Sequence, residues 1–334
     1  MGAKQLFLEV LEVSSQMLFE SVHVRAERNI AEVSRLCAIN CPQMENRDNI
    51  NFPPIRLPFS LCAKTGKYKN AGKHIFSTHK TMRFSGKVAI VTGSSAGIGQ
   101  ATVLRLASEG AKVVVHGRNA EKIQATLRLL DKMGIRCEDV LAFQGEIQDD
   151  VFIEYLVKRT IEKFGKIDIL VNNAGLGGAP GMDPNSMETY DYIQDVNVKS
   201  VMKLTNIVLP HLEKTRGNVV NAPPMLYYAM SKAALDHFMR SKTEEFAQKG
   251  VRINCVNPGY IITDFLKQMD VPSSVEHKLT NGYNATNPLG RSGIPSDIAK
   301  PIAFLASDDA CYVTGVALTV DGGQVMKSAL VNPS

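Results

Sequence analysis

Tyr228 and Lys232 are the two residues of this chain whose types and spacing most directly indicate proton-transfer chemistry. Residues four positions apart lie on one face of a helix, so the Lys232 ammonium would lie near the Tyr228 phenol. A free tyrosine phenol has a pKa of about 10, and a neighbouring cation lowers that pKa by favouring the phenolate. The pair could therefore act as a general acid and base near neutral pH.

A glycine-rich turn, TGSSAGIG at residues 92–99, follows a short apolar run and opens a helical pattern. Gly93 permits the tight turn, Gly97 lets the backbone approach a pyrophosphate, and Gly99 allows the helix to pack closely on the strand. The free N–H groups of the helix N-terminus would hold the anion. This context favours dinucleotide binding over an ordinary glycine-rich loop. The predicted phosphate-binding residues are Gly93, Ser94, Ser95, Gly97, Ile98 and Gly99.

The second apolar run, at residues 111–117, ends without the carboxylate that an NAD-preferring site offers to the ribose hydroxyls. Gly117 stands there and Arg118 follows. A guanidinium can pair with a 2′-phosphate and stack on adenine, so the sequence favours NADP(H) over NAD(H), with Arg118 and Asn119 beside the cofactor. The alternative is an ordinary surface arginine. His116 is given no special role.

The elements that must position these residues begin at about Lys87. Apolar runs alternate there with helical patterns, which predicts a parallel sheet covered by helices on both faces. Right-handed crossovers make such a sheet doubly wound. We therefore predict an α/β, Rossmann-type domain over residues 83–334, with strands within 87–93, 111–117, 139–146, 166–175, 216–221, 250–259 and 315–323.

The composition predicts a globular protein with a sizeable core. The 334 residues are 44% hydrophobic and 21% charged, and the formal net charge is +5. Lys and Arg are scattered, which argues against a nucleic-acid surface. No apolar run is long enough to cross a bilayer.

The six cysteines are far apart, which favours reduced thiols and a cytoplasmic location over a disulfide framework. Cys37 and Cys41 could supply half of a metal site, but no second pair has the required spacing, so we expect no metal.

Residues 1–82 are expected to form a poorly ordered extension without chemistry. Pro53, Pro54 and Pro58 argue against regular structure there. The segment lacks the pattern of a signal peptide, and its acidic residues argue against a mitochondrial transit peptide. A targeting or docking role for its basic stretch is the alternative.

A set of motifs in a fixed order resembles the short-chain dehydrogenase/reductase family over nearly all of residues 83–326. The motifs are TGSSAGIG, NNAG at 172–175, DVNVKS at 195–200, YAMSK at 228–232, NPGYIIT at 257–263 and the segment from PLGRSG to VDGG at 288–323. The closing segment is most similar to 3-oxoacyl-carrier-protein-reductase-like members and to broad-specificity alcohol or ketone reductases. The resemblance implies a nicotinamide cofactor, a small-molecule carbonyl or alcohol substrate, hydride transfer between them, and usually a homotetramer.

The resemblance also implies roles for individual residues. Tyr228 would be the acid and base, and Asn197 would organise a water in the proton relay. Tyr228 and Lys232 would also bind the cofactor, with Lys232 holding the nicotinamide ribose. Glu146 stands where relatives usually have an aspartate near the adenine. Two groups would line the cofactor groove: Asn173, Ala174 and Gly175 on the adenosine side, and Pro258, Gly259, Ile261 and Thr263 at the nicotinamide and its phosphate.

One expected residue is missing. The family normally has a serine at the end of the fifth strand, where its hydroxyl bonds the substrate carbonyl. Here GNVVN at 217–221 runs directly into APPMLYYAMSK at 222–232, so the segment with that serine is absent. Thr215 precedes the strand and Ser231 lies on another helix face, so neither is a substitute. The chain is then either an active reductase or a cofactor-binding pseudoenzyme with impaired turnover.

Overall fold

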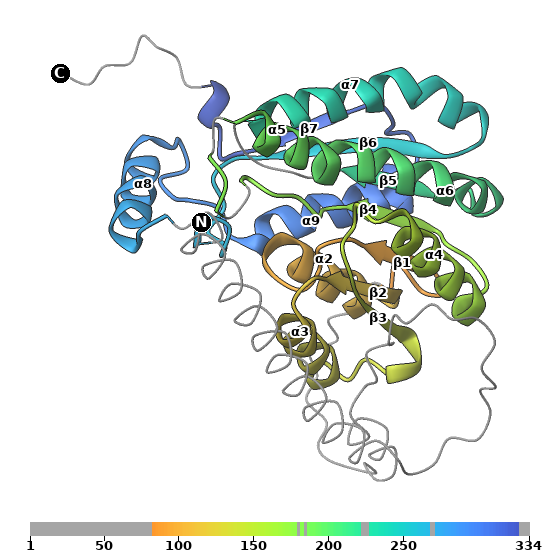
Figure 1. The fold of residues 1–334 in the computed structure, drawn as a ribbon. Coiled ribbons are helices and arrows are strands. Elements are labelled where there is room, and N and C mark those ends of the chain that lie inside the picture. The colour runs from red at the N-terminus through yellow and green to blue at the C-terminus, as the bar shows by residue number, and fades with distance from the viewer. Residues whose placement is uncertain (1–81, 179–180, 184–185, 222–226, 268–270, 327–334) are drawn as a thin grey trace, which may run out of the picture. The chain divides into compact units, whose positions relative to one another are not determined.

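Seven parallel strands form one sheet in the computed structural model, which describes residues 82–178, 181–183, 186–221, 227–267 and 271–326 (Figure 1). The side chains at 227–230 and 232 are not described. The strand order is β3-β2-β1-β4-β5-β6-β7. The bounds are β1 Val88–Val91, β2 Lys112–Gly117, β3 Val140–Gln144, β4 Ile169–Asn172, β5 Asn218–Asn221, β6 Arg252–Pro258 and β7 Ala317–Val320.

Helices cover both faces of this sheet (Figure 1). On one face α2 packs against α3 and α9, and on the other α4 packs against α6 and α5 against α7. The bounds are α2 Gly97–Ser108, α3 Ala120–Lys132, α4 Asp150–Phe164, α5 Met187–Gln194, α6 Ser200–Thr215, α7 Tyr227–Gln248, α8 Ser273–Thr286 and α9 Pro295–Ala306. The predicted doubly wound, Rossmann-type fold is thus confirmed.

The apolar runs form strands because their side chains are buried from both sides. All four residues of β1, β4 and β5 are buried, as expected when helices lie on both faces of a parallel sheet. The intervening helices have clear local signals. In α4 the Asp149 side chain caps the N-terminus, and Gly165 ends the helix with a φ of 79°.

The order of the strands determines where a ligand can bind. From β1 the chain progresses outward to β2 and β3, then returns to pair β4 with the other side of β1. Loops that follow β1 and β4 therefore diverge, and this divergence opens a crevice at the carboxyl edge of the sheet. The glycine-rich turn follows β1 and lies at this crevice.

The first described residues are tied into the sheet domain. Phe84 is fully buried, and the Arg83 guanidinium donates to the buried Glu109 carboxylate at 2.6 Å and to Asp309 at 2.9 Å. The predicted extension lies outside the described residues except for Met82. Its boundary with the domain stays a prediction.

Candidate cofactor and active site

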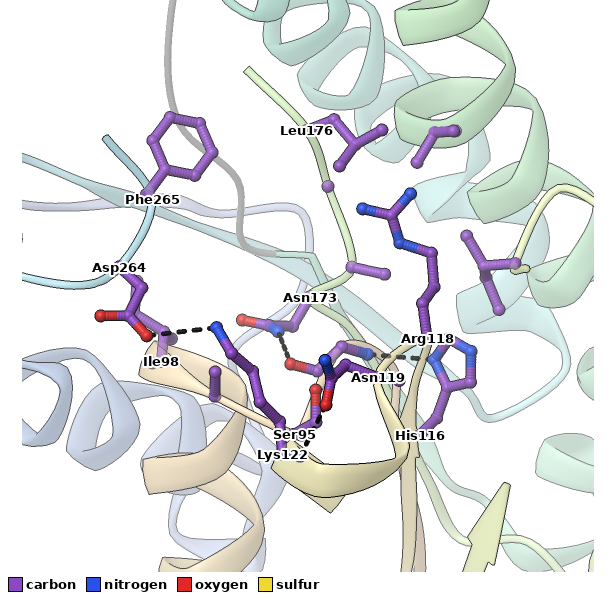
Figure 2. A pocket seen from close by; sticks show the side chains of 18 of the residues that line it. Ser95, Ile98, His116, Arg118, Asn119, Lys122, Asn173, Leu176, Asp264 and Phe265 are labelled. Atoms are coloured by element: carbon purple, nitrogen blue, oxygen red, sulfur yellow. Dashed lines mark hydrogen bonds and ion pairs between the residues drawn. The ribbon is translucent and has the colours of Figure 1, made fainter. Parts of the chain in front are cut away.

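A cavity of about 600 Å³ lies at the carboxyl edge of the sheet, beside the switch between β1 and β4 (Figure 2). Its volume falls within the range of small-molecule sites. The loops after β1, β2, β3, β4 and β6 all contribute to its walls. Ten predicted cofactor residues line it: Gly93, Ser95, Gly97, Ile98, Arg118, Asn119, Asn173, Ala174, Gly175 and Thr263.

The glycine-rich turn forms one wall of the cavity and requires its glycines. Gly93 and Gly97 have φ values of +65° and +55°, which other residues rarely adopt. A Cβ atom at Gly99 would lie 2.4 Å from the Gly93 carbonyl oxygen and from the Asn173 side chain. Gly99 thus allows close packing behind the turn, as the sequence predicts, and does not itself line the cavity.

The N-terminus of α2 opens into this cavity with its backbone donors uncapped. Ala96 occupies the N-cap position, no side chain bonds the first-turn N–H groups, and the first turn contains no acidic residue. A helix begun in this way offers N–H groups and a positive dipole end to an anion.

Asn173 braces the turn from the neighbouring strand. Its side-chain amide donates to the Thr92 carbonyl at 2.9 Å and to the Gly93 carbonyl at 3.2 Å. The Thr92 hydroxyl accepts the N–H groups of Asn173 and Ala174, both at 3.0 Å. These bonds fix the two sides of the crevice relative to each other.

His116 joins two walls of the cavity, a role that the sequence does not indicate. Its ring is buried at the end of β2. Gly93 N–H donates to Nδ1 at 3.1 Å, so the proton is on Nε2, which donates to the Gly145 carbonyl at 3.2 Å. The neutral ring therefore holds the glycine-rich turn and the β3–α4 loop together.

Burial lowers the pKa of His116 from 6.5 to about 4, partly offset by the Gly145 bond and reinforced by Arg118. The His116 imidazole is thus neutral in the folded protein, and it binds a proton more readily in the unfolded chain. Its contribution to stability is complete above pH 6.5 and falls by about 1.4 kcal/mol per pH unit from 6.5 down to about 4.

We expect His116→Asn to remove this slope. Urea unfolding of the full chain at several pH values between 4.5 and 7.5 measures it, with each value within or just above the interval that the shifted pKa defines. The variant should be less stable at neutral pH but lose less stability on acidification. His237→Asn, at an exposed position of α7, is the matched control and should keep the wild-type slope. If stability fell with pH as steeply in His116→Asn as in the wild type, the pH dependence would not come from His116.

Gly117 is the last residue of β2 and Arg118 follows it. A Cβ atom at Gly117 would lie 2.4 Å from Ser95 Oγ, so the turn leaves no room for a side chain there. Arg118 is half-exposed and extends beside the cavity next to His116 (Figure 2). Its Nη1 donates to the Tyr192 hydroxyl at 3.3 Å and lies 3.6 Å from a Glu146 carboxylate oxygen.

A second cation, Lys122, lies at the cavity in the first turn of α3. Its Nζ is 3.2 Å from Asp264 Oδ2, and both residues line the cavity. The hydrogen bond that Lys122 donates to Asp264 lowers the pKa of the Asp264 carboxyl below its ordinary value. These four residues form what we call the rim of the cavity: Arg118 lies beside Glu146, and Lys122 lies beside Asp264.

Some predicted cofactor residues lie outside the cavity wall. Ser94 is fully buried, its hydroxyl donating to the Val91 carbonyl at 2.7 Å and accepting the His116 N–H at 2.9 Å. Its hydroxyl braces the turn, and its predicted contact with the cofactor stays a prediction. Pro258, Gly259 and Ile261 likewise do not line the cavity, although Thr263 of the same segment does.

Asn197 is buried in a π-helical turn, Asp195–Lys199, between α5 and α6. Such turns are frequent at functional sites. Its Oδ1 accepts the Leu176 N–H at 2.8 Å, and its Nδ2 donates to the Leu176 carbonyl at 2.9 Å and to Ser231 Oγ at 3.3 Å. The side chain therefore joins the cavity wall to α7, at a buried Ser231.

Thr215 is confirmed as no substitute for the missing serine. It ends α6, and its hydroxyl donates to the Ile167 carbonyl at 2.9 Å. Ile167 precedes β4, so Thr215 lies at the amino edge of the sheet, opposite the cavity.

Tyr228 and Lys232 lie in the opening turns of α7, which begins at Tyr227. The helix confirms their i, i+4 spacing, but their side chains lie outside the described part of the chain. β5 ends at Asn221, so residues 222–226, also outside the described part, make the whole link. The short link predicted from the sequence is therefore present, and no serine lies in it.

The cavity also has walls that the sequence does not assign. Glu146, which the family resemblance places near the adenine, lines the cavity. The additional lining residues are Ala96, His116, Gly117, Lys122, Ile147, Gln148, Leu176, Gly177, Gly178, Val196, Asp264 and Phe265. Most lie in the loops that follow the strands at the carboxyl edge of the sheet, and this position is the signal that could have found them. Among described residues, buried Gln148 Oε1 has no hydrogen-bond partner, so it is an available acceptor on this wall.

Within the described ranges, no helix is long and apolar enough to cross a membrane. In the same ranges no three His, Cys, Asp or Glu side chains gather as a metal site would require.

Comparisons with known proteins identify relatives over the whole sheet domain. A family model described as Enoyl-(Acyl carrier protein) reductase matches residues 93–324. A 3-oxoacyl-[acyl-carrier-protein] reductase of Thermotoga maritima is 32% identical over 73% of this chain and all of its own. The 7alpha-hydroxysteroid dehydrogenase of Escherichia coli K12 is 35% identical over 74% of this chain and 97% of its own.

Solved structures of similar sequence share the fold of this chain. A short-chain dehydrogenase/reductase of unknown function from Caenorhabditis elegans, determined with cofactor, superposes with a TM-score of 0.70 at 33% identity, covering 74% of this chain and 98% of the other. A 7α-hydroxysteroid dehydrogenase in complex with NADH and 7-oxo glycochenodeoxycholic acid gives 0.65 at 33% identity, with the same coverage. With the fold and the cavity, these matches show that the chain belongs to the short-chain dehydrogenase/reductase family of oxidoreductases.

Proposed function

We propose that this chain is an NADP(H)-dependent oxidoreductase that interconverts a ketone and a secondary alcohol by hydride transfer. The main support is the cavity at the switch point, into which the uncapped N-terminus of α2 opens between two cationic loops. Oxidation of NADPH by a carbonyl compound in the presence of the purified chain tests the proposal.

The residues of the cavity fit a dinucleotide. The Gly97–Gly99 end of α2 would hold the pyrophosphate on its N–H groups. Gln148, with its buried and unpartnered Oε1, would accept from the exocyclic amine of adenine. Thr263 would face the phosphate on the nicotinamide side, since its methyl lies 3.3 Å from the position of a Cβ on Gly97 in the phosphate-binding turn.

NADP(H) is preferred over NAD(H) in this proposal for two reasons. Arg118 offers a guanidinium at the end of β2, where a ribose 2′-phosphate would lie. Gly117 has no space for the carboxylate that would select the free hydroxyl of NAD, because Ser95 fills that position.

We expect Arg118→Met to weaken NADPH binding by about tenfold to a hundredfold and NADH binding by no more than about twofold. A charge-assisted contact of this kind contributes about 1.5–3 kcal/mol. Titration with each reduced dinucleotide, followed by nicotinamide fluorescence, measures the two dissociation constants. Arg136→Met, which removes an exposed arginine after α3, is the matched charge control. Equal losses for both cofactors would overturn the preference.

The proton steps belong to residues of α7 and the π-helical turn. A bound nicotinamide supplies or accepts the hydride. Tyr228 would then protonate the alkoxide oxygen, with Lys232 lowering the pKa of its phenol. We assign Asn197 to the same relay, through a water, on the strength of the family motif.

A second candidate function follows from the short link after β5. The strand ends at Asn221 and α7 begins at Tyr227, and no serine lies between them. Loss of one such donor typically lowers turnover by about a hundredfold to a thousandfold. The chain would then be a cofactor-binding relative of the active enzymes, with impaired turnover.

The remaining proposals concern substrate, assembly and location. The 3-oxoacyl and steroid relatives suggest ketones, diketones and 3-oxoacyl thioesters as test substrates. We further propose a homotetramer, as is usual in the family. We also propose a cytoplasmic location, because the six cysteines lie far apart in the sequence, which favours reduced thiols.

A further inference from the structure

Lys122 and Asp264 form an ion pair across the rim of the cavity, between elements that are 142 positions apart in the sequence (Figure 2). Lys122 lies in the first turn of α3, and Asp264 follows Thr263 in the segment after β6. Both residues line the cavity. The pair therefore links the first turn of α3 to the segment after β6.

The position of the pair relates it to the phosphate-binding turn. Thr263, next to Asp264, touches the turn, because its Cγ2 lies 3.3 Å from the position of a Cβ on Gly97. Lys122 therefore pairs with the neighbour of the residue that lies beside Gly97, the first residue of α2. The N-terminus of α2 is the end of the cavity where the proposed function puts the pyrophosphate.

From this geometry we propose that Lys122 is a pyrophosphate-binding residue and that Asp264 is an internal anion that competes with the pyrophosphate for it. On cofactor binding, Lys122 exchanges the carboxylate for a phosphate oxygen. The inference rests on the proposed function, since it adds a binding residue to that same site.

The relative strengths of the two contacts favour the exchange. The side chains of Lys122 and Asp264 are 41% and 49% exposed, and ion pairs this exposed change an equilibrium by no more than about fivefold. A lysine contact to a phosphate at a helix N-terminus is stronger, because the phosphate is held by N–H groups as well.

A second cation, Lys267, also lies beside Asp264. Lys267 Nζ lies 3.6 Å from Asp264 Oδ1. The carboxylate therefore stays paired after Lys122 has left, and its release costs little. Arg118 acts at the other end of the cavity, beside Glu146, so the two cations serve different phosphates.

Dissociation constants of NADPH, NADH and ADP, measured by calorimetry on the full chain, test the proposal. Lys122→Met should weaken all three by about tenfold, because all contain the diphosphate. Asp264→Asn should tighten all three by about twofold to fivefold, since the competing anion is gone. In the Lys122→Met background, Asp264→Asn should have no effect.

Lys132→Met is the matched control. It removes the same charge from the far, exposed end of α3 and should leave the three constants within about twofold. Thermal unfolding of each variant shows whether the fold is kept, and an exposed pair predicts little change.

The outcomes separate this inference from the proposed function. Failure of NADPH and NADH to bind, with ADP binding still dependent on Lys122, would refute the function and support the inference. Loss of NADPH affinity alone in Lys122→Met would assign the lysine to the 2′-phosphate and overturn the inference. Unchanged constants in Lys122→Met, or absence of ADP binding to the wild-type chain, would overturn it too.

Discussion

Insertion of a serine-containing connector between Asn221 and Ala222 is expected to raise the rate of NADPH-dependent carbonyl reduction by about a hundredfold or more. The inserted hydroxyl would bond the substrate carbonyl and stabilise the charge that develops on its oxygen. The insertion would also lengthen the link between the end of β5 and the start of α7, which now consists of residues 222–226. Steady-state NADPH consumption against ketones, diketones and 3-oxoacyl thioesters measures the change.

A connector of equal length with alanine in place of the serine is the matched control. It separates the chemistry of the hydroxyl from the geometry of the link. If the hydroxyl matters, the alanine connector should recover less than about a tenth of the serine connector's rate. A native chain that turns over within about tenfold of the serine-restored chain would show that the missing serine is not needed.

Replacement of Tyr228 by phenylalanine in the restored chain should lower turnover by about a hundredfold to ten-thousandfold. The phenol is the only group that we assign to protonate the alkoxide, and phenylalanine keeps the ring while removing the proton. Affinity for NADPH should stay within about twofold, since we propose that the glycine-rich turn and the cations Arg118 and Lys122, which line the cavity, hold most of the dinucleotide.

Tyr227→Phe is the control for that substitution, because Tyr227 is one position away on the same helix and its i+4 neighbour is Ser231. It should keep turnover within about threefold of the restored chain, because we assign Tyr227 no part in the proton transfer. If Tyr228→Phe retained most of the activity, the assignment of the acid and base would be wrong.

The sheet could be predicted from the sequence because its signal is local and repeated. The run VAIV of β1 and the run ILVN of β4 are fully buried, and only a covered parallel strand needs apolar residues on both faces. The glycine-rich turn could also be predicted, since Gly93 and Gly97 have φ values that few other residues adopt.

The rim of the cavity could not be predicted in the same way. The pair of Lys122 and Asp264 depends on how the segment after β6 folds back across α3, and nothing near either residue in the sequence encodes that approach. The link that His116 makes between the glycine-rich turn and the β3–α4 loop depends on the Gly93 N–H and the Gly145 carbonyl, which lie on either side of one buried ring. Long-range contacts of this kind appear only with the tertiary structure.

Local motifs also assigned too much to single residues. Ser94 belongs to the glycine-rich stretch, yet its hydroxyl is used inside the turn between Val91 and His116. A stretch of backbone that binds phosphate needs some of its side chains to hold its own shape. A motif alone cannot tell which ones these are.

Transfer of deuterium from NADPH to a carbonyl substrate tests the central claim most directly. The full chain, native and with the serine connector, is incubated with NADPH that contains deuterium at the transferable position and with each test carbonyl. The account predicts a secondary alcohol with deuterium on its carbinol carbon, formed slowly by the native chain and faster by the restored one. NADPH binding without deuterium transfer by either chain would contradict it.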